Sequence, residues 1–532
     1  GWLAMKKITL LIFLFFGCAQ CLVFGQVPPS SSPLDPGLSL EKPVADSEES
    51  NATAEEPSEP SRSTQSQTIM RAGKDLRHPE EGRRVGAAKL LGKYPGIQSN
   101  LLLIIALDDK SPLVRRASMV SLAEQASNGY LLYDKSLIEK IYSKLGDSDV
   151  EVRRGVATMI PQLVRGLRGG VVYRPVQAGM RPDLVLLTQK AFLDPDAIVR
   201  QNVLKYHLYL GVPLPVSVLE KLLADQDLGV LLTALGRIYS NASQVSIVNK
   251  IEDLSKHSDR GIRLKVVSVA RDANRFHVRY RSILRGMTKD KDPEVTSMAA
   301  VELARFGEKI PAEVIERIKN YLLGVEGMSS QVTTILYSIS AMGKDAIQVY
   351  QALTEHSSSQ IRKVAWQRYF NLSSAVNKPK LWMPALEDRD KGVRDVVLMS
   401  LRGRSLDMAQ TDMQKIVESR FPDVRIFAGQ LLLTSKKELV EEFGFDLLID
   451  EDTVVRSTTI RAMASRKVPG WVNVMKRSLL DDDYVIQRAA MDGLLSDRAE
   501  GVQALKKFVS ENPQNRISSM AVSQLRARGI QP

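Results

Sequence analysis

Residues 146–160 read GDSDVEVRRGVATMI, and the same pattern returns as LDPDAIVRQNVLKYH from Leu193 and DEDTVVRSTTIRAM from Asp450. Each copy has a short acidic turn, then an arginine and apolar residues at intervals of three or four, as on one face of a helix. Asp or Ser in such a turn accepts hydrogen bonds from the free N–H groups of the helix that follows. Each copy therefore predicts the turn and the second helix of a helical hairpin.

The recurring arginine measures the length of the repeat. Arg362, Arg394, Arg425 and Arg456 are spaced 32, 31 and 31 residues apart, and the upstream copies are spaced more widely. With the weaker copies included, the chain holds about fourteen units. One helix pair cannot bury its own apolar stripe, whereas stacked pairs share a continuous core. The sequence therefore predicts an all-α fold, an α-solenoid of about fourteen helix pairs, over residues 69–532.

The signature D-x-D-x-x-V-R-x-x-A is almost complete at 147–156, 194–202 and 450–458. It resembles the HEAT-repeat family, in particular the short bacterial repeats related to phycobilisome lyases. The resemblance implies that the recurrent acids and arginines form an internal ladder between turns. The residues to which it gives this structural role are Asp149, Arg153, Arg200, Arg394, Arg425 and Arg456.

The first 25 residues have the order of a secretory signal peptide, with residues 1–4 as a possible upstream extension. Lys6 and Lys7 precede an apolar run over 8–16, and Val23-Phe24-Gly25 offers a cleavage site. This run is shorter than the ~20 residues of a membrane-spanning helix. We therefore expect an exported protein of the bacterial periplasm or cell envelope.

Cys18 gives a second interpretation of the same segment. Phe15-Phe16-Gly17-Cys18 resembles a bacterial lipobox, although the two phenylalanines depart from its usual residues. Lipidation of Cys18 would tether the protein to a membrane. The other cysteine is Cys21, so cleavage after Gly25 would leave a chain without thiols.

Residues 26–68 are rich in Ser, Pro and Glu, and such a composition predicts a disordered acidic tether. The segment 27–68 carries eight acids and two bases, a net charge of −6. Since the whole chain is +12, removing this segment together with Lys6 and Lys7 leaves +16 on residues 69–532. This basic array favours anionic partners.

The sequence offers no catalytic centre, cofactor site or metal site. Motifs for phosphate loops, serine hydrolases and zinc proteases are absent, and the five histidines are scattered. Acid pairs such as Asp108-Asp109 fall in the repeat turns, where helix capping explains them. His207 lies in the apolar stretch LKYHLYL, which predicts a packed side chain and not a ligand. We therefore expect no enzyme and no small-molecule substrate.

Two basic stretches interrupt the period and are the candidate binding segments. The stretch 164–183 predicts an inserted loop, and at helical spacing 271–286 would place Arg271, Arg275 and Arg279 on one face. The competing interpretation of both is a solvated surface. The candidate partner-binding residues are Arg165, Arg168, Tyr173, Arg174, Arg181, Arg271, Arg275, Arg279 and Arg281.

The sequence thus favours a non-catalytic exported scaffold or adaptor that binds an acidic protein along a basic solenoid surface. The alternative is a binder of an anionic envelope polymer or lipid, such as peptidoglycan or a membrane surface. A HEAT-type lyase is a distant third. Basic residues interleaved with aromatic ones also suit nucleic acid, but the export signal argues against that partner.

Overall fold

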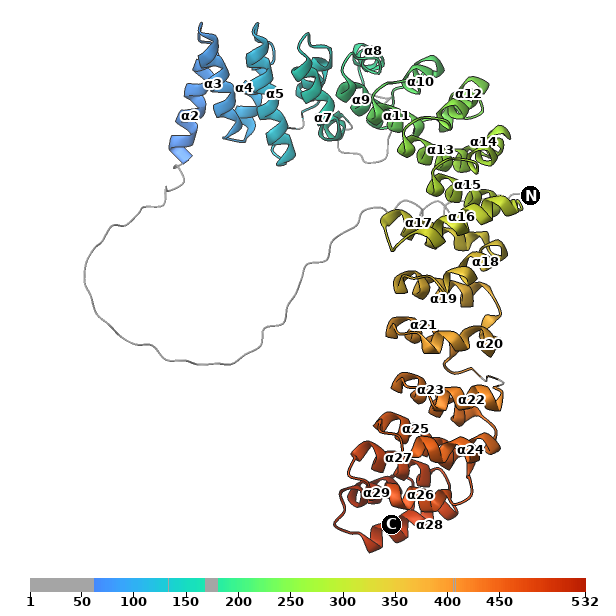
Figure 1. Cartoon of the computed structure of the whole chain (residues 1–532). Coiled ribbons are helices and arrows are strands. Elements are labelled where there is room, and N and C mark those ends of the chain that lie inside the picture. Colours follow the sequence, from blue (N-terminus) through green and yellow to red (C-terminus); the bar gives the residue numbers. More distant parts are fainter. Residues whose placement is uncertain (1–61, 133, 168–179, 405, 407) are drawn as a thin grey trace, which may run out of the picture. The chain divides into compact units, whose positions relative to one another are not determined.

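A computed structural model of the protein describes residues 62–132, 134–167, 180–404, 406 and 408–532 (Figure 1). The predicted signal peptide (1–25), Cys18 and the predicted tether up to residue 61 lie outside these residues. The described residues form helices and no β-strand. None of these helices is both long and apolar enough to span a membrane.

The odd-numbered helices form one layer of the fold. Each packs on the next along the chain, from α3 to α17 and again from α19 to α29. These helices are α3 (Glu81–Gly92), α5 (Pro112–Ser127), α7 (Val150–Leu167), α9 (Ala197–Leu210), α11 (Leu228–Leu235), α13 (Arg260–Ala273), α15 (Pro293–Arg305), α17 (Ser330–Ser338), α19 (Ser359–Leu372), α21 (Lys391–Leu401), α23 (Pro422–Thr434), α25 (Thr453–Arg466), α27 (Tyr484–Leu495) and α29 (Arg516–Ala527).

The even-numbered helices form the second layer, and most of them pack on the odd-numbered helix that follows. They are α2 (Arg62–Asp75), α4 (Ile97–Ala106), α6 (Lys135–Ser143), α8 (Pro182–Ala191), α10 (Val216–Leu222), α12 (Val245–Leu254), α14 (Arg279–Met287), α16 (Ala312–Gly324), α18 (Lys344–Leu353), α20 (Pro379–Trp382), α22 (Gln410–Val417), α24 (Lys437–Leu448), α26 (Trp471–Ser478) and α28 (Glu500–Glu511). Short 3₁₀ helices supplement them at 144–146, 239–241, 339–342, 375–377 and 383–387.

The predicted all-α solenoid of about fourteen helix pairs is confirmed, with pairs from α2–α3 to α28–α29. Its core lies between the two layers and runs through all the repeats. The largest fully buried side chains include Trp382, Tyr142, Tyr280, Tyr350 and Phe192. Each fully buried side chain of this kind contributes roughly 1.5–3 kcal/mol, so every repeat depends on its neighbours for stability.

Polar residues in the turns start the odd-numbered helices, as the sequence predicts. Asp196 accepts hydrogen bonds from the N–H groups of Ile198 and Val199 at 3.0 and 3.2 Å. The same contact recurs at Asp227, Asp259, Asp292, Asp390, Asp452 and Asp483. Each such cap is worth about 1 kcal/mol.

The folded array begins earlier than residue 69, because helix α2 starts at Arg62, inside the segment predicted to be disordered. Ala72 is buried and Gly73 lies against Leu102 of the next repeat. These contacts hold the C-terminal half of α2. A helix anchored at one end extends at low cost, so the polar residues 62–68 continue it in spite of their composition.

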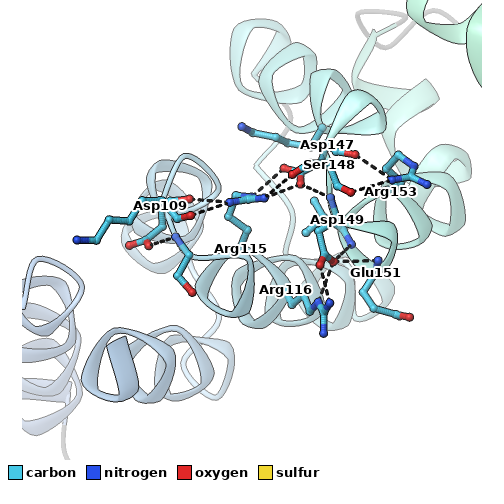
Figure 2. A network of polar contacts seen from close by, with 12 residues as sticks. Asp109, Arg115, Arg116, Asp147, Ser148, Asp149, Glu151 and Arg153 are labelled. Carbon is cyan, nitrogen blue, oxygen red and sulfur yellow. Dashed lines mark hydrogen bonds and ion pairs between the residues drawn. The ribbon is translucent and has the colours of Figure 1, made fainter. Parts of the chain in front are cut away.

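Arginine–aspartate pairs connect successive turns of the odd-numbered layer (Figure 2). Arg115 Nε donates to Asp147 Oδ2 at 2.9 Å, and its Nη2 donates to Asp147 Oδ1 at 2.8 Å. We call each such two-bond pair a rung. The rungs in the described residues are Arg84–Asp109, Arg115–Asp147, Arg153–Asp194, Arg200–Asp225, Arg263–Asp290, Arg362–Asp388, Arg394–Asp423 and Arg425–Asp450.

Every rung arginine also secures its own turn. Arg115 Nη1 donates to the backbone carbonyls of Asp109 and Lys110 at 3.0 and 3.3 Å. The acceptor Asp147 in turn accepts from the backbone N–H of Asp149 at 2.9 Å. Hydrogen bonding to Asp147 raises the pKa of the Arg115 guanidinium further above its usual value. A rung therefore fixes two consecutive turns and keeps both of its charges satisfied.

A second tier of ion pairs lies beside the first rungs. Asp149 caps α7 and also accepts from Arg116 of the preceding repeat, at 2.8 and 2.5 Å (Figure 2). Hydrogen bonding to Arg116 lowers the pKa of Asp149 below its usual value. Arg154 and Asp196 repeat this pair one unit further on. The ladder role inferred for Asp149 thus involves Arg116, while Arg153 binds Asp194.

His207 is packed in the core and has no hydrogen-bond partner among the described residues. It is 4% exposed, and its ring meets that of Phe192 edge-on with centroids 5.9 Å apart. Burial, together with the charge of Arg237, lowers the pKa of His207 to about 4.

Removing one partner of a rung should destabilise the protein more than removing both charges. In R115M the largely buried Asp147 carboxylate loses its counter-ion, which costs about 3–5 kcal/mol of unfolding free energy. In R115M/D147N the amide oxygen still accepts from Asp149 N–H, so we expect at least ~1 kcal/mol to return. Urea unfolding followed by circular dichroism, with D147N as the control, measures this. A double variant no better than R115M would contradict it.

His207 should make the protein less stable in mild acid. The unfolded chain binds a proton on this histidine near pH 6.5, whereas the folded chain binds it only near pH 4. The stabilising contribution is therefore complete above pH 6.5 and is lost as the pH falls toward 4. Between pH 7 and 4.5 we expect the wild type to lose roughly 2 kcal/mol more than H207L. Equal losses in urea titrations of both proteins would refute this assignment.

Candidate functional site

The rungs fall into three segments in the described part of the chain. The first runs from Arg84 to Asp225, the second is the single pair Arg263–Asp290, and the third runs from Arg362 to Asp450. Leu231 fills the arginine position between the first two segments and is buried like the rung arginines. Leu231 cannot form an ion pair with the next turn, so the ladder stops there.

A histidine begins each of the three segments. His78, His257 and His356 occupy the turn position, six residues before the arginine, at which most other repeats have Asp. The Nδ1 atoms accept from the N–H two residues further on at 3.1, 3.0 and 3.0 Å. This contact replaces the one that the Asp carboxylate makes, and at His257 and His356 it places a ring proton on Nε2. An imidazole ring therefore closes the turn where no arginine of the preceding repeat arrives.

Sequence reasoning missed this arrangement because it treated the histidines as scattered candidate ligands. The signal was present as a constant spacing of six residues to Arg84, Arg263 and Arg362. Arg456 also differs from the inferred ladder. Its Nη1 donates to the carbonyls of Asp450 and Glu451, but it makes no ion pair with the next turn in the described residues.

The predicted loop at 164–183 begins later than expected, because α7 continues to Leu167 and contains Arg165. Arg168, Tyr173 and Arg174 lie outside the described residues. Arg181 stands directly before α8 and pairs with Asp183 at 3.0 and 2.7 Å. Hydrogen bonding to Asp183 raises the pKa of this exposed guanidinium.

The single helix face predicted for Arg271, Arg275 and Arg279 is wrong. Helix α13 ends at Ala273 and α14 begins at Arg279, so a turn separates these arginines. The His277 ring closes this turn, since its Nδ1 accepts from Arg279 N–H at 3.2 Å. The apolar spacing continues across the turn, which is why the sequence pattern suggested one helix.

Most arginines of this segment have acidic partners. Arg271 pairs with Asp272 at 2.7 Å, and Arg279 pairs with Glu252. Arg281 lies 3.7 Å from Glu308, which also binds Arg285 at 2.8 Å. Arg275 makes no ion pair with any described residue, and its guanidinium lies 4.8 Å from the ring centre of Phe276. The segment is therefore less basic toward solvent than its sequence suggests.

The surface charge instead comes from lysines. The turn aspartates are engaged in rungs and caps, so their negative charge faces the interior of the turns. Lysines that form no ion pair with a described residue include Lys110, Lys205, Lys256, Lys265, Lys289, Lys291, Lys309 and Lys363. The ammonium groups of these lysines are therefore available for contacts with anionic groups.

Exposed apolar side chains lie on two neighbouring helices, α9 and α11. Ile198 and Leu208 on α9 are 42% and 61% exposed, and Leu228 and Leu232 on α11 are 43% and 38% exposed. The two helices pack side by side. Lys205 is also exposed on α9 and lies 5.4 Å from the ring centre of Tyr206. We call these five residues the α9–α11 stripe. Exposed apolar side chains gathered on one surface mark protein-binding sites.

No group of three or more His, Cys, Asp or Glu side chains in the described residues is arranged to hold a metal ion. The carboxylates that cluster in the turns, such as Asp481 and Asp483, accept backbone N–H groups at 2.8 Å. Their geometry is that of helix capping.

Neither a protein-family model nor a curated protein matches this chain. Among solved structures, E. coli YibA covers 55% of this chain and 98% of its own at 16% identity, with a TM-score of 0.34. Kap95p, in a structure with RanGDP, matches over 87% of this chain and 66% of its own chain, at 11% identity and a TM-score of 0.40. Kap121p bound to RanGTP matches over 87% of this chain and 55% of its own chain, at 13% identity and a TM-score of 0.46. These likenesses are low, so the fold assignment rests on the repeat geometry above.

Two substitutions together should restore the missing rung between the first two ladder segments. L231R alone places an unpaired guanidinium at a buried position, which costs about 3–5 kcal/mol of unfolding free energy. L231R/H257D supplies the carboxylate and restores the usual rung, so we expect it to recover at least ~2 kcal/mol. A double-mutant cycle by urea unfolding, with H257D as the second single variant, measures the coupling. Additive effects would show that Leu231 does not occupy the arginine position.

Proposed function

We propose that this protein is a non-catalytic scaffold or adaptor of the HEAT type, which binds an acidic partner protein on the odd-numbered layer of its solenoid. The observation that carries the proposal is the α9–α11 stripe, where four exposed apolar side chains lie on neighbouring helices beside Lys205. Apolar residues at the centre of an interface supply most of the affinity, and charges around them select the partner.

The charge distribution supports an acidic partner. The turn aspartates are committed to rungs and caps, whereas lysines such as Lys205 and Lys265 have no acidic partner in the described residues. A partner with acidic side chains around an apolar segment matches both the unpaired lysines and the exposed apolar residues of this surface. Steering by such charges raises the rate of association more than the final affinity.

The cellular setting that we propose is the bacterial envelope. It rests on the signal-like sequence of residues 1–25, with lipidation at Cys18 as its membrane-tethered form. The alternative function is binding of an anionic envelope polymer or lipid through Arg165, Arg181 and the 271–286 segment. The ion pairs of Arg271 and Arg279 weaken that alternative, since they already satisfy part of its charge.

Charged substitutions in the α9–α11 stripe should abolish partner binding. L208E/L232E places two carboxylates among the apolar contacts, and we expect recovery of the partner to fall at least tenfold. The measurement is in-cell crosslinking of the full-length protein, followed by mass spectrometry of envelope fractions. The matched control is V454E/V485E, which changes similarly exposed residues near the starts of α25 and α27.

A single partner crosslinked to α9 and α11, lost in L208E/L232E and kept in the control, supports the scaffold. Unchanged recovery from a folded L208E/L232E protein would rule out the stripe as the interface. Diffuse crosslinks, with retention on cell wall that falls steeply with salt, would favour the polymer binder.

A further inference from the structure

A cavity opens at the turn edge of the array beside the isolated rung Arg263–Asp290. It has a volume of about 440 Å³ and lies between the turn that precedes α13 and the turn that precedes α15. This volume is within the usual range of small-ligand sites. The residues that line it are Ser255, Lys256, His257, Ser258, Arg263, Gly286, Met287, Lys289, Asp290 and Lys291.

Three of the lining residues are lysines without an acidic partner. The side-chain ammonium groups of Lys256, Lys289 and Lys291 form no ion pair or hydrogen bond with any described residue. The one carboxylate in the lining is that of Asp290, and both of its oxygens accept from Arg263, at 2.7 and 3.1 Å. The pair Arg263–Asp290 is electrically neutral, so the three ammonium groups leave the cavity with an excess of positive charge.

Nearby acids do not neutralise these lysines. Asp259 accepts from the backbone N–H of Ile262 at 2.9 Å as the cap of α13, and Asp292 pairs with Arg260 at 3.1 Å. Arg317 adds another positive charge from α16, since its Nη2 donates to the backbone carbonyl of Asp290 at 2.6 Å. The acids beside the cavity are therefore engaged in the fold, while its cations are free.

His257 explains why the cavity has this charge. At this turn position most repeats carry Asp, but here Nδ1 accepts from Asp259 N–H at 3.0 Å and no carboxylate is present. Nε2 then holds the ring proton. It has no partner in the described residues, and it is not enclosed as Nε2 of His356 is. His257 therefore places a hydrogen-bond donor, its Nε2–H, on the wall of the cavity. A turn with the usual Asp would place a carboxylate acceptor there.

From these donors we infer that the cavity binds a phosphate group, either free phosphate or a phosphate monoester. Three ammonium groups, an imidazole N–H and the hydroxyl of Ser258 suit an anion with several acceptor oxygens and up to two negative charges. Lysine acts on phosphate as a strong point charge, and such charge-assisted hydrogen bonds are the strongest available. A single carboxylate would leave most of these donors without an acceptor.

The turn itself does not require the lysines. Lys256 and Lys289 follow α12 and α14, where a positive charge favours the helix dipole, but the equivalent residues of other turns are Gly146, Leu193 and Ala224. Lys291 follows Asp290 as Lys110 follows Asp109. Gathered around one cavity, the three lysines form a binding site that helix stability alone does not demand.

The test uses the full-length chain and two probes. Inorganic phosphate is titrated by calorimetry at low ionic strength, and phosphatidylcholine vesicles with and without phosphatidic acid are tested by co-sedimentation. K256M/K289M/K291M should weaken binding at least tenfold, since it removes all three free charges. The matched control K110M/K265M/K363M removes three other unpaired lysines, and we expect a change of no more than twofold.

H257D gives a second variant that keeps the fold. Asp481 occupies the same turn position without a rung arginine and still accepts from Asp483 N–H at 2.8 Å, so Asp is compatible with this turn. The added carboxylate should weaken phosphate binding at least tenfold. Lysine-dependent binding of free phosphate supports a soluble ligand, and lysine-dependent binding of phosphatidic acid alone supports a lipid headgroup. Phosphate and vesicle binding that the lysine variant leaves unchanged, or no saturable binding of either probe, would overturn the proposal.

Discussion

The rung between an arginine and the aspartate of the next turn is the constraint on which the array depends. In sequence the two partners of a rung lie between 25 and 41 residues apart, yet the Nε–Oδ2 distances stay between 2.6 and 2.9 Å. Even-numbered helices and loops of different lengths are thus accommodated without changing the spacing of the turns. The planar guanidinium enforces this, because its three nitrogens must meet one carboxylate and two carbonyls at once.

The parts of the fold that the sequence predicted are those set by local chemistry. The acidic turns, the caps and the apolar stripes recur within each repeat, and together they were sufficient for a solenoid of fourteen helix pairs. The start at Arg62 and the turn between Ala273 and Arg279 were not predictable in the same way. Residues 62–68 are helical through tertiary contacts of α2, and the apolar spacing after Ala273 continues through a turn.

The candidate sites were harder to predict than the fold, for an electrostatic reason. Arg279 and Arg285 looked like free charges because their partners Glu252 and Glu308 lie 27 and 23 residues away in the sequence. The lysines of the turns, by contrast, cannot be recognised as a cluster in the sequence, because each stands alone there. The folded array shows that Asp290 is engaged in a rung, whereas Lys256, Lys289 and Lys291 form no ion pair with a described residue.

The interruptions of the ladder connect stability with binding. An intact rung pairs an arginine with an aspartate, so the rung itself offers no net charge to a ligand. Where Leu231 ends the first segment, the next turn needs no carboxylate, and His257 closes it through Nδ1. The same exchange removes the one acid that would oppose an anion between Lys256 and Lys291. The turn edge at this point therefore holds a cavity that three unpaired lysines line, and the one carboxylate in its lining is already paired with Arg263.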